Sequence, residues 1–146
     1  MKKKTELLIY SIALLVIALC NLGMLVMDFN AGAFEMVTHE DALVEKVTNI
    51  ILMVLLGCGI ISIIANAYLG VKGIVSVVNL SHGRLHIFIA KVIGTFNLVL
   101  TVIVGLSLLN STDLASDFKT FLLCLVDVIL MYSYAKAAKA VRNGEE

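Results

Sequence analysis

The sequence predicts an all-α membrane protein: four transmembrane helices in an antiparallel bundle, with the N-terminus and the C-terminus both in the cytoplasm. Three observations lead to this prediction. The 146 residues are 60% hydrophobic and only 15% charged, whereas soluble domains are roughly 45–50% apolar and about 25% charged. Four long apolar runs divide the chain, and the basic residues gather on alternate sides of them. A chain of this length cannot hide so much apolar surface inside one water-soluble globule, so lipid must cover it.

The four apolar runs define the expected spans. Each run approaches or exceeds the ~20 residues that a helix needs to cross a hydrocarbon core of about 30 Å, and the chain contains no proline that would interrupt a helix. The first run is longer than the ~7–15 apolar residues of a signal peptide, so we expect it to be retained. We therefore expect a single domain, residues 1–146, with spans at about 7–27, 48–70, 87–109 and 118–136.

The positions of lysine and arginine give the orientation. Only Lys46 and Lys119 lie on the side opposite the other nine of the 11 basic residues, and basic loops remain in the cytoplasm. This predicts outer loops at 28–47 and 110–117, an inner hairpin at 71–86 and a cytoplasmic basic tail at 137–146. The basic residues expected at the inner membrane interface are Lys72, Arg84, Lys91, Lys136 and Lys139.

Two connections carry further expectations. In the first outer loop, Thr38 can cap a helix whose first turn is acidic, so we expect the second helix to begin near His39. At the inner hairpin, either the second and third helices project roughly 12 Å past the membrane, or they are long, tilted helices that remain within it. A projecting apolar hairpin would be a docking surface for a partner or a second copy.

Asp127 lies deep inside the fourth span, ten residues after Asp117 and nine before Lys136. A charged carboxylate at the centre of a membrane helix costs about 2.5–3.5 kcal/mol on an insertion scale. We therefore expect this side chain to face the interior of the bundle. It is a candidate proton relay, a candidate cation site, or a hydrogen-bonded link between helices.

Several uncharged polar residues lie at a similar depth. Counted inward from the flanking lysines, Ser62 and Thr101 are ten residues deep, at the level of the carboxylate, whereas Asn66 and Asn97 are six residues deep and form a second layer. The alternative is that these side chains only make interhelical hydrogen bonds, worth about 0.6–2 kcal/mol each. The expected intramembrane polar cluster consists of Asp127, Ser62, Thr101, Asn66 and Asn97.

Small residues recur along the second span at intervals of two to five positions. Small side chains let helix backbones approach closely, which suggests that this helix is the central contact of the bundle. The expected helix-packing residues are Gly57, Gly59, Ser62, Ala65 and Gly70.

The motif inventory does not favour an enzyme. The sequence lacks a nucleophile elbow, a His-Glu-x-x-His pair, a glycine-rich phosphate loop and a Cys-x-x-Cys pair. The spacing of its three cysteines matches neither a disulfide framework nor a zinc site, so we expect no metal and no cofactor. The 11 basic and 11 acidic residues cancel, and no basic stripe indicates a nucleic-acid partner.

Two functions remain for a multi-pass protein of the cell membrane, which we expect to be the cytoplasmic membrane of a bacterium. The first is a non-enzymatic accessory, regulatory or protective subunit that acts through helix contacts with a membrane-protein partner or a second copy. The alternative is a small oligomeric channel or a proton- or cation-coupled transporter that uses Asp127. Water reaching the carboxylate would favour the alternative.

Overall fold

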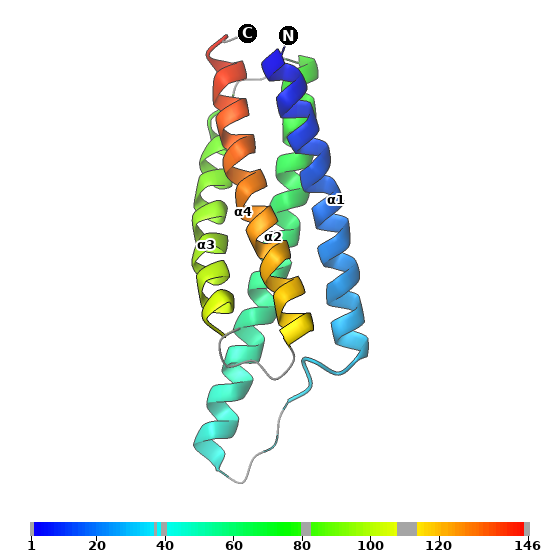
Figure 1. The fold of residues 1–146 in the computed structure, drawn as a ribbon, viewed down its shortest axis with the longest axis vertical. Coiled ribbons are helices and arrows are strands. Elements are labelled where there is room, and N and C mark those ends of the chain that lie inside the picture. The colour runs from blue at the N-terminus through cyan, green and yellow to red at the C-terminus, as the bar shows by residue number, and fades with distance from the viewer. Residues whose placement is uncertain (1, 37, 39–40, 80–82, 108–113, 145–146) are drawn as a thin grey trace.

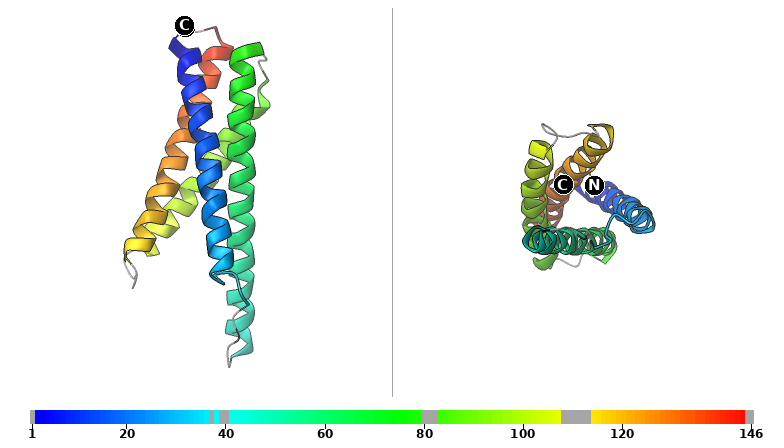
Figure 2. Two further views of the ribbon diagram at one scale, coloured as in Figure 1. Left: turned by 90° about the vertical axis from the view of Figure 1, so that its right-hand side faces the viewer. Right: turned by 90° about the horizontal axis from the view of Figure 1, so that it is seen from below.

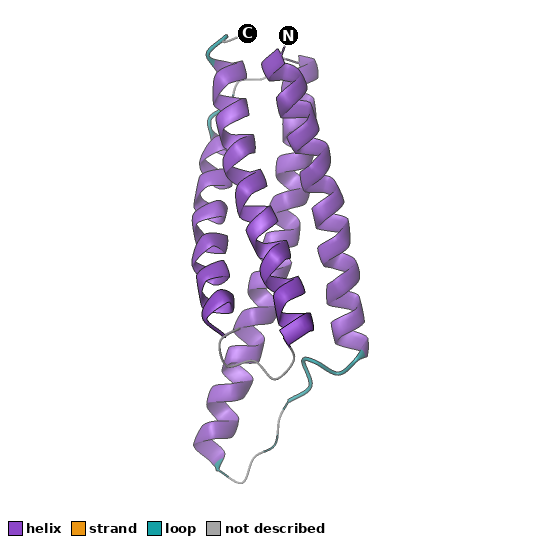
Figure 3. Ribbon diagram, in the orientation of Figure 1, coloured by secondary structure: helices purple, strands orange, loops and turns teal. Residues whose placement is uncertain are grey.

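The chain folds into four long helices in the computed structural model, which describes residues 2–36, 38, 41–79, 83–107 and 114–144 (Figure 1). Short loops make up the rest of the described residues (Figure 3). Each helix is long and apolar enough to cross a membrane. The helices are α1 (Lys2–Asn30), α2 (Ala42–Asn79), α3 (Leu85–Ser107) and α4 (Leu114–Arg142).

The apolar surface of these helices faces mainly outward. Between 11% and 39% of the most apolar stretch of each helix is buried inside the protein. In water such a surface would be expected to drive association or aggregation, whereas in a bilayer it is simply solvated by lipid. The four helices are therefore consistent with a multi-pass membrane protein, in which lipid would take the place of much of a globular core.

The two chain ends lie at the same end of the molecule, here called the terminal end, which carries Lys2 and Arg142 (Figure 1). The opposite end, which carries Asn30 and Ala42, is called the loop end. At the terminal end, the last turn of α2 lies level with the start of α1 and the end of α4 (Figure 1). The end of α2, in the hairpin 71–86, therefore does not project beyond α1 and α4 at this end of the molecule.

The helices associate as two pairs. α1 packs along α2 and α3 packs along α4, while α1 also contacts α4; α2 and α3 have little contact with each other. Figure 2 shows that the two pairs are close at the terminal end and diverge toward the loop end. The expectation that the second helix is the central contact is therefore wrong, because α1 and α4 join the two pairs.

The half of the bundle at the terminal end, here called the closed half, contains the core. Its largest fully buried apolar side chains are Leu7, Leu14, Leu69, Met131 and Tyr134. The basic tail also contributes, because α4 continues through it to Arg142. Within it, Lys139 faces outward while Ala137 and Ala138 pack inward on this core, as a helical stripe requires.

α2 begins later than the sequence predicts. Asp41 Oδ1 accepts hydrogen bonds from the backbone N–H of Leu43 (2.9 Å) and of Val44 (3.4 Å), so Asp41 caps a helix that starts at Ala42. Thr38 lies outside the helix, and His39 falls outside the described residues. Asp41 caps the helix because its carboxylate directly precedes the free N–H groups of the first turn. Its negative charge also interacts favourably with the positive end of the helix dipole.

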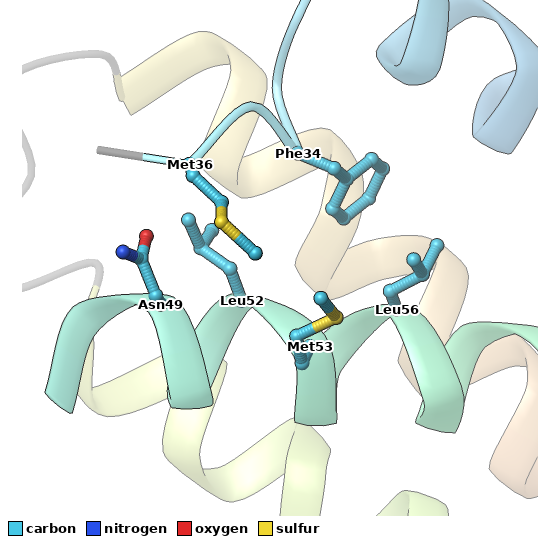
Figure 4. Close-up of a pocket in the computed structure, with 6 residues that line it drawn as sticks. All are labelled: Phe34, Met36, Asn49, Leu52, Met53 and Leu56. Atoms are coloured by element: carbon cyan, nitrogen blue, oxygen red, sulfur yellow. The ribbon is translucent and has the colours of Figure 1, made fainter. Parts of the chain in front are cut away.

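α2 is the longest helix, with 38 residues, or roughly 57 Å at 1.5 Å per residue. Its first turns extend past the ends of the other three helices (Figure 1). The loop after α1 covers part of this extension, with Phe34 and Met36 lying over Leu52, Met53 and Leu56 (Figure 4). The gap between them measures about 20 Å³, which is far below the ~300 Å³ of a small-molecule site. It is therefore a packing seam.

Candidate functional site

Asp127 lies where the two helix pairs begin to diverge. It projects from α4 and is only 4% exposed. Asn66 on α2 and Asn97 on α3 are also buried, and Ser62 lies one helical turn from Asn66 on α2. Three helices thus bring polar side chains to one point in an otherwise apolar interior.

One carboxylate oxygen, Oδ2 of Asp127, accepts three hydrogen bonds. The donors are Asn97 Nδ2 at 2.8 Å, Asn66 Nδ2 at 3.2 Å and Ser62 Oγ at 3.3 Å. Asn97 Nδ2 also lies 3.5 Å from Ser62 Oγ. Donors from α2 and α3 therefore converge on an acid from α4, and the carboxylate links α2 to α3 where these helices otherwise have little contact.

The depth layers differ from the sequence prediction. Thr101 is buried, but its hydroxyl donates to the backbone carbonyl of Asn97 on its own helix at 2.7 Å. The two asparagines, expected one layer away, contact the carboxylate directly. Depth counted along straight helices fails here because the helices are inclined to one another (Figure 2).

Two buried oxygen atoms of this cluster have no hydrogen-bond partner among the described residues: Asp127 Oδ1 and Asn66 Oδ1. Buried side-chain oxygens are normally paired, and leaving one unpaired costs about 1–3 kcal/mol. Since both atoms are acceptors, what the site lacks is a donor. A proton on the carboxyl, a water molecule or a cationic group would supply it.

A cavity of about 400 Å³ extends from the loop end of the bundle to this carboxylate. Asp28 and Phe34 line its outer part, and Ser62, Asn97 and Asp127 line its deep part. It also passes the thiols of Cys58 and Cys124. The cavity occupies the space that opens as the two helix pairs diverge (Figure 2), so the half of the bundle at the loop end is called the open half.

The expected packing residues divide between the two halves. A Cβ on Gly57 would meet nothing within 4 Å, and one on Gly59 would meet only a leucine methyl at 4.0 Å. Gly59 lines the cavity instead. These two glycines therefore make no close helix contact, because they lie in the open half where the helices have already separated.

The close approach of helices occurs at Gly70 and Gly73. A Cβ on Gly70 would lie 2.8 Å from the Ser11 carbonyl oxygen on α1. A Cβ on Gly73 would collide with the Ser11 hydroxyl and lie 2.6 Å from Tyr134 Cε2. Of the other expected packing residues, Ala65 is buried in the core and Ser62 serves the carboxylate. The prediction omitted Gly73, although its spacing from Gly70, a small-x-x-small pattern, was available.

The expected interface lysines and arginine are all exposed, and they belong to the terminal end of α2, α3 and α4. They take no part in the polar cluster. The cavity residues Asn21, Asp28, Cys58 and Cys124 were not expected as a group. Nothing in their spacing indicates it, because only the divergence of four helices brings them to one space.

No family model, no curated protein and no solved structure matches this chain in the comparisons. The site must therefore be interpreted from its own geometry and chemistry.

Proposed function

We propose that this chain is a small proton- or cation-coupled transporter that uses Asp127 as its binding group. In this proposal it is an antiparallel four-helix bundle with both termini in the cytoplasm. The terminal end then faces the cytoplasm and the loop end faces outward, because nine of the 11 basic residues lie at the terminal end and its flanks.

The single observation that carries this proposal is the cavity that reaches Asp127. An acid that served only to join helices would need no route to the surface. Here the carboxylate lies at the deep end of a space of about 400 Å³ that opens at the loop end, and one of its oxygens has no partner among the described residues. Acids buried in membrane proteins typically face such cavities when they carry ions or protons.

The closed half supports a carrier more strongly than an open pore within one copy. Between the carboxylate and the terminal end, the interior is filled by buried side chains, which include Leu7, Leu69, Met131 and Tyr134. Transport through one copy therefore requires the two helix pairs to rock, opening the terminal end while the loop end closes. The pairwise packing of α1 with α2 and of α3 with α4 suits such a movement.

The test is flux in proteoliposomes. The purified full chain is reconstituted, and proton, Na⁺ and K⁺ movements are followed under an imposed gradient for wild type, Asp127→Asn and Glu35→Gln. Asp127→Asn is nearly isosteric and keeps an oxygen that can accept the bonds now made to Oδ2. Glu35→Gln is the matched acid-to-amide change at an exposed residue outside the cavity.

We expect wild type and Glu35→Gln to give equal flux, above that of empty liposomes. The flux through Asp127→Asn should be at least tenfold lower than that through wild type. Unchanged flux in Asp127→Asn, or no flux of any of these cations with wild type, would refute the proposal.

A second candidate, an accessory or regulatory subunit, is favoured by one feature. The extension of α2 beyond the other helices exposes Leu43, Val47 and Ile50, and apolar surface outside a bilayer usually contacts a partner. Purification in mild detergent tests it. A particle of one copy with no co-purifying protein would count heavily against this candidate and would leave the transport proposal untouched.

A further inference from the structure

We propose that the cavity binds a lipophilic amine: an organic cation that carries at least one N–H on its nitrogen. Its ammonium group contacts Asp127, and its apolar body lies against the cavity wall. This inference rests on the proposed function, because it names the class of cation for the same site.

The wall of the cavity selects an apolar body. All four helices contribute apolar side chains to it: Leu25 from α1, Leu55 and Ile63 from α2, Leu100 from α3 and Leu123 from α4. The volume of about 400 Å³ falls within the ~300–1,000 Å³ of small-molecule sites. A hydrated inorganic ion would gain nothing from such a wall, whereas a hydrocarbon cage or ring would be removed from water by it.

The charges that line the cavity select a cation. Asp28 lies at the outer part and Asp127 at the deep part. Among the residues that the structure describes, those that line this cavity include no lysine, arginine or histidine. A cation entering from the loop end thus meets an acid at the mouth and a second acid at the floor.

The unpaired oxygens select an N–H donor. Ser62, Asn66 and Asn97 all donate to Oδ2 of Asp127, while Asp127 Oδ1 and Asn66 Oδ1 lack a partner among the described residues. Because Asp127 lines the cavity, an ammonium N–H that enters it can donate a charge-assisted hydrogen bond to Asp127 Oδ1. A quaternary ammonium has no N–H, and its methyl groups would hold the nitrogen away from oxygens this deeply buried.

A metal ion fits the site less well. The described residues include no group of three or more His, Cys, Asp and Glu side chains that could hold one. Hard cations such as Mg²⁺ and Ca²⁺ need about six or more oxygen ligands, and one carboxylate with two amides and a hydroxyl falls short.

Amine and proton compete for the same oxygen. A protonated Asp127 that binds R–NH₃⁺ releases its own proton, so that COOH and R–NH₃⁺ become the pair COO⁻ and R–NH₃⁺ plus one free H⁺. Charge and atoms balance, and exchange of one amine for one proton follows. This is the coupling that the proposed transporter requires.

The native thiols offer a direct test of binding. Cys58 lines the cavity, while Cys20 is exposed on the surface of α1. Two single-cysteine proteins, with the other two cysteines changed to serine, are placed in lipid nanodiscs and reacted with a hydrophilic methanethiosulfonate. The probes are adamantan-1-amine, the neutral adamantan-1-ol and the quaternary N,N,N-trimethyladamantan-1-ammonium, which share one apolar cage.

We expect saturating adamantan-1-amine to slow labelling of Cys58 at least fivefold and to leave any labelling of Cys20 unchanged. The alcohol and the quaternary ion should protect little, and Asp127→Asn in the Cys58 background should abolish protection by the amine. Equal protection by amine and alcohol, or protection that survives Asp127→Asn, would overturn the inference. Protection by Na⁺ or K⁺ and not by the amine would also overturn it.

A second variant guards against loss of folding in Asp127→Asn. Leu100→Trp places an indole in the cavity, whereas Leu19→Trp makes the same change on a leucine that is 69% exposed. Protection by the amine should disappear in Leu100→Trp and persist in Leu19→Trp; persistence in both would refute binding in this cavity. Amine protection without flux would refute only the transport proposal, and flux without amine protection would refute only this inference.

Discussion

The Asp127 carboxylate is an unusual linker between helices because it accepts donors from two other helices on a single oxygen. Asn97 provides the shortest of these bonds, at 2.8 Å. Hydrogen bonds between membrane helices are worth about 0.6 kcal/mol on average and rarely above about 1.7. Three of them could hold together a region where α2 and α3 otherwise have little contact, while the second oxygen is buried without a partner among the described residues.

Removing the Asp127 carboxylate should therefore destabilise the bundle more than replacing it with a neutral amide. Asp127→Ala leaves the side-chain donors of Ser62, Asn66 and Asn97 unpaired, and we expect a loss of about 1–3 kcal/mol in the free energy of unfolding. Asp127→Asn should lose less, because an amide oxygen can take the place of Oδ2. Unfolding by a denaturing detergent, followed by far-UV circular dichroism, measures both. A larger loss in Asp127→Asn than in Asp127→Ala would contradict the hydrogen-bonding role.

At the scale of elements, the structure depends on where two helices can touch. α1 crosses α2 most closely at Gly70 and Gly73, against Ser11. Ser11 itself is buried and its hydroxyl donates to the Leu7 carbonyl at 2.6 Å. The contact closes one half of the molecule, while Gly57 and Gly59 on the same helix lie free of close contact in the other half. Identical residue types thus have different roles along one helix.

Alanine substitutions should distinguish these glycines. Gly73→Ala would push a methyl group into Ser11 and Tyr134, and overpacking of this kind costs about 1–3 kcal/mol. Gly57→Ala has open space and should be neutral or slightly stabilising, since alanine is the better helix former. Unfolding free energies of the two variants test this. Adding Ser11→Gly to Gly73→Ala should restore part of the loss; no restoration would show that the collision is not the cause.

The cap of α2 gives a local prediction. Asp41→Ala removes the acceptor for the Leu43 and Val44 N–H groups, which typically costs about 0.5–2 kcal/mol of helix stability. Because the first turn of α2 extends beyond the other helices (Figure 1), we expect this turn to fray without unfolding the bundle. Hydrogen exchange should accelerate at the amides of Leu43 and Val44 and remain unchanged near Asn66. Faster exchange at both places would contradict a purely local role.

At the scale of the whole molecule, two helix pairs make a body that is closed at one end and open at the other (Figure 2). The chain termini and most basic residues belong to the closed end, and the cavity opens at the other. The proposed orientation therefore makes the cavity accessible from outside the cell. This arrangement links the distribution of charge along the sequence to the side from which Asp127 is reached.

Thiol labelling of intact cells tests the orientation. A membrane-impermeant methanethiosulfonate added outside should label Cys124, which lines the cavity, in a variant carrying Cys20→Ser and Cys58→Ser. A cysteine introduced as Asn143→Cys, at the exposed end of the chain, should react only after the cells are permeabilised. The opposite pattern would show that the cavity opens toward the cytoplasm.

Several features of the chain follow from the sequence alone. Four apolar runs without proline can only be helices in lipid, so the number and type of the elements were predictable. Asp127 was also identifiable, because an acid among apolar neighbours must find polar partners. Candidate partners at about its depth could be named, since each residue adds about 1.5 Å along a helix that crosses the membrane.

Only the tertiary structure decided which faces meet. Depth did not reveal that Asn66 and Asn97 contact Asp127 while Thr101 bonds to its own helix, because depth says nothing about rotation around a helix axis. Likewise, Gly70 and Gly73 make a tight helix contact in the closed half, whereas Gly57 and Gly59 on the same helix make none in the open half. The reason is the crossing of the helices: their inclination fixes where they touch, where they separate and hence where a cavity can reach the carboxylate.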